Sequence, residues 1–209
     1  MIQTRRALVA ALLLVALGGT LFAKTKFKSV WRSPDAATMK VGGKKVAALV
    51  IDTELSLRMA GEEALANELT ARGMQGVPAY RIVPKEELRD ADKAKGWFER
   101  SGVEAVVVLR VVNDKQRITY QPSTWSSPYY TSLWGYYGYG WGAVYDPGYV
   151  RDDRIVSLET LIYSVPKNAL MWAGMSETEN PKSPGKTVEE VVKEAVKEMK
   201  KQGLAQNQK

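Results

Sequence analysis

The chain contains no cysteine and no histidine among its 209 residues. The missing cysteine excludes disulfides, zinc ribbons, thiol catalysis and a lipid-modified amino-terminal cysteine. The missing histidine removes the side chain that most often acts as a general base near neutral pH and most often ligates metals. We therefore expect no catalytic residue, no metal site and no cofactor, and a protein that is not an enzyme.

Positive charge is in excess, at a net +7, but it is unevenly distributed. Residues 24–45 carry seven basic side chains and one acidic one, whereas residues 46–185 carry 18 acidic and 15 basic side chains. A nucleic-acid-binding domain carries its positive excess on the folded face. We therefore expect no nucleic-acid partner. Residues 24–43 are interpreted as a basic extended arm, either solvated or in contact with anionic lipid headgroups.

The first 23 residues follow the tripartite pattern of an export signal. Two arginines precede an apolar run that ends at Leu17, and the small residue Ala23 precedes Lys24. The run is shorter than the roughly 20 residues of a membrane-spanning helix. The pattern predicts a signal peptide over 1–23, cleavage between Ala23 and Lys24, and a periplasmic or cell-envelope location. An uncleaved anchor is the alternative, because positive charge directly after a signal resists translocation.

Strands and helices alternate in the first half of the predicted domain. The runs KKVAALVI (44–51) and EAVVVLRVV (104–112) are continuously apolar, which is typical of strands buried on both faces. Between them the pattern predicts a helix over 54–72, a short strand over 77–84 and a second helix from Pro84 to Gly102. This order predicts a mostly parallel sheet with helices on its faces.

The second half has a different pattern. The segments 154–165 and 170–178 alternate apolar and polar residues, which predicts an antiparallel hairpin. Thr187 and Glu190 have the spacing of a capping box at the start of a carboxyl-terminal helix. The predicted fold class is therefore α/β, with three helices packed on one mixed sheet in a single domain over 44–204. Residues 205–209 are expected to form a frayed tail.

Three groups of charged residues are candidate sites. Asp52, Thr53, Glu54 and Arg58 follow the first buried strand, where open α/β sheets place ligands. A helix cap is the preferred interpretation, because no glycine-rich phosphate loop accompanies them. Asp152, Asp153 and Glu159 are candidate ligands of a hard cation, and Glu177 with Glu179 is a second acidic group. Their spacing matches no calcium loop, so both groups are interpreted as solvated strand ends.

Large aromatic residues concentrate in YYTSLWGYYGYGWGAVYDPGY, residues 129–149. In an extended conformation the rings from Tyr137 onward would share one face and the intervening glycines the other. Such a ribbon suits stacking on sugar rings, insertion at a lipid headgroup interface or addition to a sheet edge. The predicted binding residues of this insert, 120–150, are Trp125, Tyr129, Tyr130, Trp134, Tyr136, Tyr137, Tyr139, Trp141 and Tyr145. A low-complexity loop folded loosely on the sheet is the alternative.

Several strings resemble a family of bacterial envelope proteins of unknown function, many of them hypothetical lipoproteins. They are SVWRSPD, LSLRMAGEEALANELTARGMQGVPAYRIVP, SGVEAVVVLRVV, and the closing MWAGMSET with VVKEAVKEMKKQGL. At the level of fold, the chain is similar to the amino-terminal α/β domain of the Tol–Pal periplasmic propeller protein and to curli-secretion lipoproteins. The resemblance implies an α/β fold and an envelope location, and it brings no catalytic residues. This chain departs from the lipoproteins because it has no cysteine to lipidate.

These observations predict a non-catalytic envelope protein that acts as a binding or assembly module through its aromatic insert. The expected partner is an envelope protein, a glycan or the membrane surface, and an oligomer is compatible with the sequence. One alternative is a carboxylate-dependent enzyme of envelope glycans that uses Asp52 with Glu54. Another is an oligomeric subunit of an export apparatus that assembles through edge strands.

Overall fold

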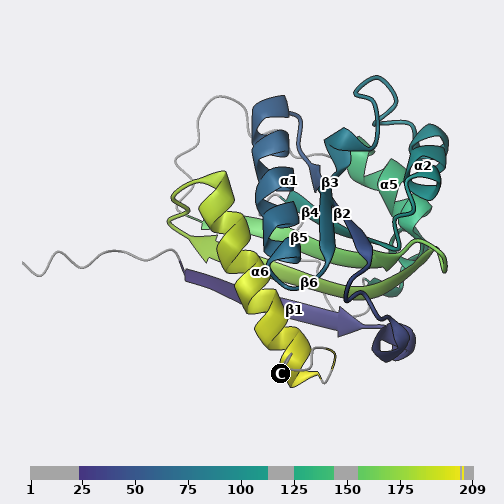
Figure 1. Cartoon of the computed structure of the whole chain (residues 1–209). Coiled ribbons are helices and arrows are strands. Elements are labelled where there is room, and N and C mark those ends of the chain that lie inside the picture. The colour runs from purple at the N-terminus through teal and green to yellow at the C-terminus, as the bar shows by residue number, and fades with distance from the viewer. Residues whose placement is uncertain (1–23, 113–124, 144–154, 203, 205–209) are drawn as a thin grey trace, which may run out of the picture.

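A computed structural model describes residues 24–112, 125–143, 155–202 and 204. Its centre is a six-stranded mixed sheet with the order β1-β6-β5-β4-β2-β3 (Figure 1). The strands are β1 (Lys24–Arg32), β2 (Lys45–Ile51), β3 (Gln75–Pro78), β4 (Ala105–Val112), β5 (Ile155–Ser164) and β6 (Ala169–Glu179). The helices are α1 (Leu55–Thr70), α2 (Ala91–Arg100), α4 (Pro128–Thr131), α5 (Leu133–Gly142) and α6 (Pro184–Lys201), with short 3-10 turns η1 (Pro34–Thr38) and η2 (Ala79–Arg81). The predicted α/β class is confirmed.

The parallel half has the predicted order of strands and helices. β2 lies between β3 and β4 and runs parallel to both. The second helix starts later than predicted, because the Asp90 carboxylate accepts hydrogen bonds from the N–H groups of Asp92 and Lys93, each at 3.1 Å. The strand predicted over 77–84 ends at Pro78 and continues as η2.

The antiparallel half contains the predicted hairpin and one strand that was not predicted. β5 and β6 pair with each other, and β5 also pairs with β4. β1 pairs with β6 from Lys24 opposite Glu179 to Arg32 opposite Trp172. The segment 24–43, expected as an arm outside the domain, therefore contributes an edge strand to the sheet.

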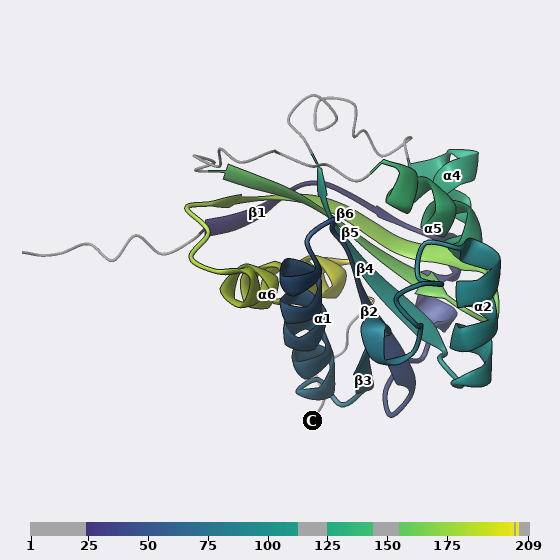
Figure 2. The same cartoon turned by 90° about the horizontal axis from the view of Figure 1, so that it is seen from above.

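The sheet separates two layers of helices. Seen from above, α1 and α6 cover one face, while α2, α4 and α5 cover the other (Figure 2). Alternate residues of the central strands divide between the two resulting cores. Val46 and Ala48 pack with the α1–α6 layer, whereas Ala47 and Leu49 pack with the α2–α5 layer.

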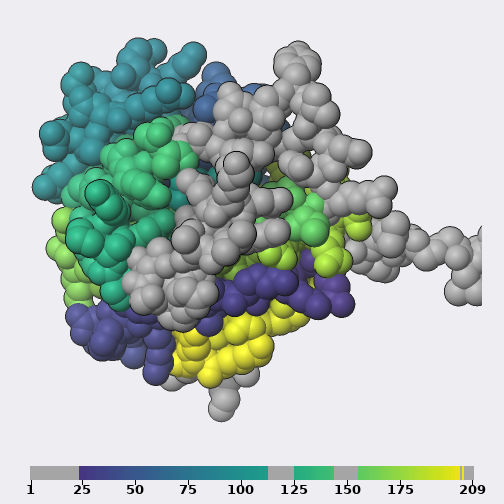
Figure 3. Space-filling view, turned by 180° about the vertical axis from the view of Figure 1, so that it is seen from behind, coloured from purple at the N-terminus to yellow at the C-terminus, as the bar shows by residue number. Residues whose placement is uncertain are grey.

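The aromatic segment is helical, so the predicted extended ribbon is wrong for its described part. α5 buries Leu133, Tyr136, Tyr137, Gly140 and Trp141, which recur at the spacing of one helical face. Gly140 permits close approach to the sheet, because a Cβ there would lie 2.6 Å from Ile51 Cδ1. The segment packs beside α2 on the rear of the molecule (Figure 3). Its buried rings belong to the hydrophobic core, which is incomplete without them.

Candidate functional site

The structure places the predicted aromatic residues at different depths. Five are buried in the core on the α5 side of the sheet: Trp125, Tyr130, Tyr136, Tyr137 and Trp141. Trp134 and Tyr139 are partly buried against that core. Tyr129 is 61% exposed and stacks on Tyr139 with ring centroids 5.3 Å apart. Tyr145 and Ala23 lie outside the described residues, and Lys24 begins β1. Any outward-facing aromatic surface of the described segment therefore centres on Tyr129.

A buried polar cluster fixes α5 to the sheet. Arg110 of β4 and Glu159 of β5 face each other across the strands, and both are fully buried. The Arg110 Nε–H donates to Glu159 Oε2 at 2.8 Å, and the Tyr136 hydroxyl donates to the same oxygen. Arg110 Nη1 also donates to the carbonyl of Ala143, at 2.9 Å. The interpretation of Glu159 as a solvated strand end is therefore wrong, because this carboxylate is the buried partner of an arginine and a tyrosine.

The buried tyrosines of this face act as hydrogen-bond donors. Burial raises the pKa of Tyr136, Tyr137 and Tyr163 above the usual value, so all three stay protonated. Tyr137 donates to the carbonyl of Leu88 at 2.7 Å, and Tyr163 donates to that of Tyr130 at 2.9 Å. Each hydroxyl thus joins a strand, helix or turn to its neighbour, which is a structural role.

The charged residues after β2 form a helix start and a buried pair. Asp52 accepts a hydrogen bond from the Glu54 N–H at 2.8 Å, and Glu54 accepts one from the Ser56 hydroxyl at 2.5 Å. α1 begins at Leu55 without a side-chain cap bond. Arg58 is buried, with its Nη1 3.8 Å from a carboxylate oxygen of Glu62. The structure thus separates Arg58 from the polar turn and joins it to a residue that sequence reasoning missed.

Glu62 accepts hydrogen bonds from two backbone N–H groups, one in β2 and one just after β3. β3 pairs with β2 only as far as Ala48 opposite Pro78, so the Val50 N–H lies beyond the end of β3. Glu62 is fully buried and accepts hydrogen bonds there from the N–H groups of Val50, at 3.3 Å, and Tyr80, at 2.8 Å. Burial raises the pKa of Glu62 to about 7, although the Tyr80 N–H and the Arg58 charge oppose the shift.

The raised pKa of Glu62 makes the stability of the fold depend on pH. Below its ordinary pKa of 4.5 the carboxyl is protonated in both the folded and unfolded states. Between pH 4.5 and about 7 the unfolded chain releases this proton while the folded chain keeps it, so the free energy of unfolding should fall as pH rises. We expect Glu62 to contribute a decrease of about 3 kcal/mol across that window.

Urea unfolding at a series of pH values measures this decrease. Glu62→Gln should remove most of the slope, because the amide does not titrate. Glu63→Gln is the matched control, since the neighbouring side chain is partly exposed and pairs with Arg81 at 2.5 Å. Equal slopes in the wild type and Glu62→Gln would contradict the assignment.

The face of the sheet that α1 and α6 cover holds a groove of about 980 Å³, which lies between these two helices. Its walls come from the carboxyl-terminal parts of these helices, and its floor comes from β4 and β5. The lining side chains are mainly aliphatic and include Leu65, Leu69, Val107, Ile162, Val192 and Val196. Met39, Met74 and Met199 also line it. Sequence patterns indicated the two helices but not the space between them.

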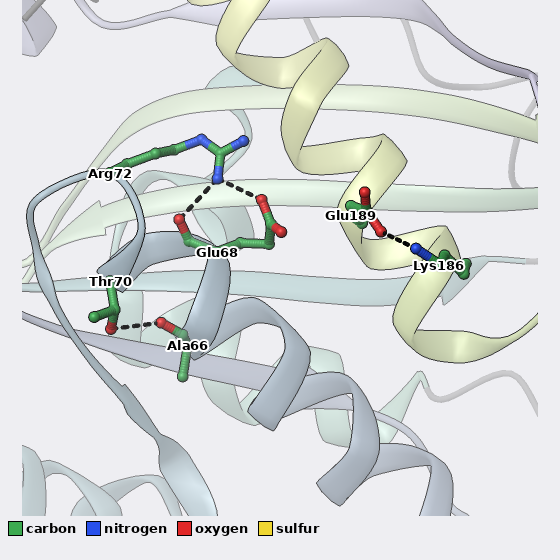
Figure 4. A network of polar contacts seen from close by, with 6 residues as sticks. All are labelled: Ala66, Glu68, Thr70, Arg72, Lys186 and Glu189. Carbon is green, nitrogen blue, oxygen red and sulfur yellow. Dashed lines mark hydrogen bonds and ion pairs between the residues drawn. The ribbon is translucent and has the colours of Figure 1, made fainter.

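The polar groups of the groove are few. Arg72 reaches back along α1 to Glu68, where its Nη1 contacts the carboxylate and donates to the carbonyl at 2.8 Å (Figure 4). Lys200 of α6 also lines the groove. On the floor, the Thr160 hydroxyl is buried and has no hydrogen-bond partner. The described part of the lining therefore combines aliphatic side chains with one unpartnered hydroxyl, two cations and one carboxylate.

Two arrangements among the described residues would indicate chemistry, a facing pair of carboxylates in the groove and a cluster of metal ligands. Glu68 is the one carboxylate among the described lining residues of the groove, so these residues supply no facing pair of carboxylates of the kind that glycoside hydrolysis uses. No group of three or more carboxylates lies close enough to hold a metal within the described ranges. Within the same ranges, no helix has the length and apolar character to cross a membrane.

Both edges of the described sheet carry features that oppose further strand pairing. β1 presents the exposed side chains of Lys24, Lys26 and Lys28. β3 has only four residues and ends at Pro78, which has no N–H to donate. Charged residues, proline and short length are the usual protections of an edge strand. Assembly through these edges is therefore disfavoured.

The fold places the chain in the α/β class, and comparisons add distant structural likenesses. No family model and no curated protein matches it. Two structures of PelC dodecamers from Paraburkholderia phytofirmans are similar to this chain. The first, of a variant, has a TM-score of 0.41 and 14% sequence identity, and the alignment covers 79% of this chain and 89% of that chain. The other has TM-score 0.40 and 13% identity over 81% and 90%. A lipoprotein from Neisseria meningitidis has TM-score 0.39 and 13% identity over 76% and 96%. Likenesses this distant say nothing about function, and the likeness to the Tol–Pal and curli-secretion proteins stays a prediction.

Proposed function

We propose that this chain is a non-catalytic binding protein of the cell envelope that holds an apolar ligand in the groove between α1 and α6. The observation that supports this proposal is the groove itself, with a volume of about 980 Å³ and a mainly aliphatic lining. Ligand sites are concave, mostly apolar clefts of roughly 300–1,000 Å³, and this groove, whose rim includes the exposed residues Gly42, Ala71 and Lys200, has that size and lining. A space this large between two well-formed helices therefore suits a ligand site better than a packing defect.

The envelope location is supported by the sequence of residues 1–23, which follow the plan of an export signal. The alternatives have weaker support. An enzyme of envelope glycans would use Asp52 with Glu54, whose carboxylates accept hydrogen bonds from the Glu54 N–H and the Ser56 hydroxyl at the start of α1, which is a helix-start role. An edge-strand assembly would have to overcome the lysines of β1 and the short length of β3.

A tryptophan in the groove should remove the ligand. Val196 of α6 lines the groove and is partly buried, so the Val196→Trp side chain would occupy the space. The wild-type protein, purified without detergent and examined by native mass spectrometry, should carry an apolar small molecule. Val196→Trp should lose at least about four-fifths of that occupancy, because the indole and the ligand would compete for one volume.

Lys193→Trp is the matched control, because it adds the same ring to an exposed position of the same helix outside the groove. It should keep the ligand. Melting curves of both variants verify that they fold. An empty wild-type protein, or equal occupancy in the wild type and Val196→Trp, would overturn the proposal.

A second binding surface is supported by a separate observation, the exposed ring of Tyr129 stacked on Tyr139. Stacked tyrosines offer a flat apolar face with hydroxyls at its margin, which suits a sugar ring or a lipid headgroup region. We propose this pair as the part of the aromatic insert that contacts an envelope partner. The buried rings of α5 position it from beneath.

A further inference from the structure

Arg58 is a buried arginine whose guanidinium is not satisfied by the described residues around it. The residue is 4% exposed, and its Nη1 is buried without a hydrogen-bond partner. Its charged neighbour is Glu62, but Oε1 of that carboxylate lies 3.8 Å from Nη1, which is too far for a hydrogen bond. The Glu62 oxygens instead accept from the backbone N–H groups of Val50 and Tyr80. Because a buried charged donor without an acceptor is costly, an acceptor bound from solution would stabilise this position.

Two further features of α1 make this cation unfavourable on its own. Arg58 is the fourth residue of α1, and the positive end of the helix dipole disfavours a cation there. Burial raises the pKa of Glu62 to about 7, so near neutral pH this carboxyl is only partly ionised. The guanidinium therefore keeps an excess of positive charge in a place with little solvent, and a bound anion would offset it.

A second buried N–H donor reaches the same region from the other face of the sheet. Trp141 of α5 is 8% exposed, and its Nε1 is buried without a hydrogen-bond partner. Burial raises the pKa of Tyr137, whereas the Trp141 indole and the Arg58 charge both lower it, so both groups lie near this hydroxyl. The guanidinium of Arg89 also lies over the Trp141 ring, 5.6 Å from its centroid. The region thus combines two arginines with two N–H donors that have no acceptor.

The fold brings these groups to the carboxyl end of β2. The chain leaves β2 through α1 on one face of the sheet, and it passes from β3 to β4 through α2 on the other face (Figure 2). In open α/β sheets, ligands bind at such a change of face, outside the carboxyl ends of the strands. Arg58 lies at the start of α1, which follows β2 directly. Gly140 approaches Ile51, the last residue of β2, and so places the adjacent Trp141 at the same edge.

We propose that the phosphate group of a small soluble molecule binds at this edge, between the Arg58 guanidinium and the Trp141 indole N–H. Arginine suits phosphate because its planar group donates several parallel hydrogen bonds and keeps its charge. Donors that come from two faces of the sheet suit a tetrahedral anion better than a planar carboxylate, because its oxygens point in different directions. The low exposure of Arg58 favours a free phosphate over a lipid headgroup. This site is separate from the groove between α1 and α6, so the inference is independent of the proposed function.

Proton–nitrogen NMR spectra of the full chain, titrated with inorganic phosphate, test the inference through the indole N–H signals. Trp141→Phe assigns the Trp141 signal, which should shift in the wild type until the site is saturated. Arg58→Met should weaken binding at least about tenfold, because it keeps the aliphatic stem and removes the charged donors. Arg100→Met is the matched control, because this exposed arginine stacks on Trp97 at the opposite end of α2 from Arg89. It should bind phosphate within about twofold of the wild type.

Melting curves separate loss of binding from loss of fold. Arg58→Met alone leaves Glu62 buried without its ion-pair partner, which by itself lowers stability. The double variant Arg58→Met with Glu62→Gln leaves neither charge buried, so it should fold and still fail to bind. Phosphate should raise the melting temperature of the wild type and leave that of the double variant unchanged. Val196→Trp, which fills the groove, should keep phosphate binding.

The pH dependence of binding gives an independent readout. The charged and titratable groups that face Glu62 come from α1, η2 and α5, namely Arg58, Glu63, Tyr80 and Tyr137. Sulfate is the probe here, because it is tetrahedral and keeps its charge where phosphate itself titrates. An ionised Glu62 repels the anion, so sulfate should bind at least about threefold more tightly at about pH 6 than at about pH 8. Glu62→Gln should remove this difference.

Several outcomes would overturn the inference. No response of the Trp141 signal to phosphate or sulfate would leave water as the acceptor of these donors. An equal response to chloride would show an adventitious ion only, and an equal response in Arg58→Met would place the anion elsewhere. Binding to phosphatidylglycerol vesicles without a response to inorganic phosphate would identify a lipid headgroup instead of a free phosphate.

Discussion

Glu159→Ala is expected to destabilise the fold by about 3–5 kcal/mol, the usual cost of removing one partner from a buried ion pair. Arg110 and Glu159 are both fully buried, with Arg110 Nε 2.8 Å from Glu159 Oε2. The substitution leaves a buried guanidinium without this carboxylate and takes away the acceptor of the Tyr136 hydroxyl. Urea unfolding followed by circular dichroism measures the change.

Two further variants separate charge from packing at this cluster. Glu159→Gln keeps the size of the side chain and one acceptor oxygen, so it should cost less, about 1–3 kcal/mol. The double variant Arg110→Met with Glu159→Leu should recover part of the loss, because a buried ion pair can often be replaced by apolar side chains. A loss below about 1 kcal/mol in Glu159→Ala would contradict the view that the pair joins β4, β5 and α5.

The parallel half of the fold could be predicted because its signals are local and agree with one another. The runs that became β2 and β4 are apolar without interruption, and the helix that became α1 is bounded by polar residues and Gly73. β1 is harder to predict, because its density of lysines is also typical of a solvated arm. Thr25 and Phe27 alternate with lysines and face the α6 side, which is the period-two pattern of an edge strand.

The helical conformation of the aromatic segment is hard to predict because its glycines conceal the helical spacing of its rings. Its glycines lower helix propensity, by about 1 kcal/mol each relative to alanine, and they suggested a flexible or extended segment. The spacing of Leu133, Tyr136, Tyr137, Gly140 and Trp141 already has helical period. Packing against the sheet overrides propensity here, since a glycine at position 140 is what lets the helix approach Ile51.

The candidate sites depend on geometry that no short sequence window contains. Glu62 lies on the same face of α1 as Arg58, Leu65 and Leu69, so its burial could be inferred from helical spacing. Its role could not, because the role depends on where β3 stops pairing with β2. The groove is formed jointly by α1, α6, β4 and β5, which lie far apart in the sequence, so no single segment could reveal it.

Tyr137→Ala is expected to cost about 3–5 kcal/mol, whereas Tyr129→Ala should cost about 0.5–1.5 kcal/mol. The two substitutions delete the same side chain from one aromatic segment, but Tyr137 is fully buried and Tyr129 is 61% exposed. Tyr137 also loses its hydrogen bond to the Leu88 carbonyl, which joins α5 to the turn before α2. Tyr129 loses only its stacking on Tyr139 among the ring contacts of the described residues.

Chemical unfolding measures both losses, and co-sedimentation with isolated envelopes measures the proposed contact of Tyr129 with a partner. If the insert acts as we propose, Tyr129→Ala lowers envelope association several-fold while the free energy of unfolding stays nearly unchanged. Tyr137→Ala, in contrast, lowers the free energy of unfolding. Equal destabilisation by both variants would contradict the division of the segment into a buried core and an exposed pair. Unchanged association of a folded Tyr129→Ala variant would remove the second binding surface and leave the groove as the remaining site of recognition, because the other described rings of the segment are at least partly buried.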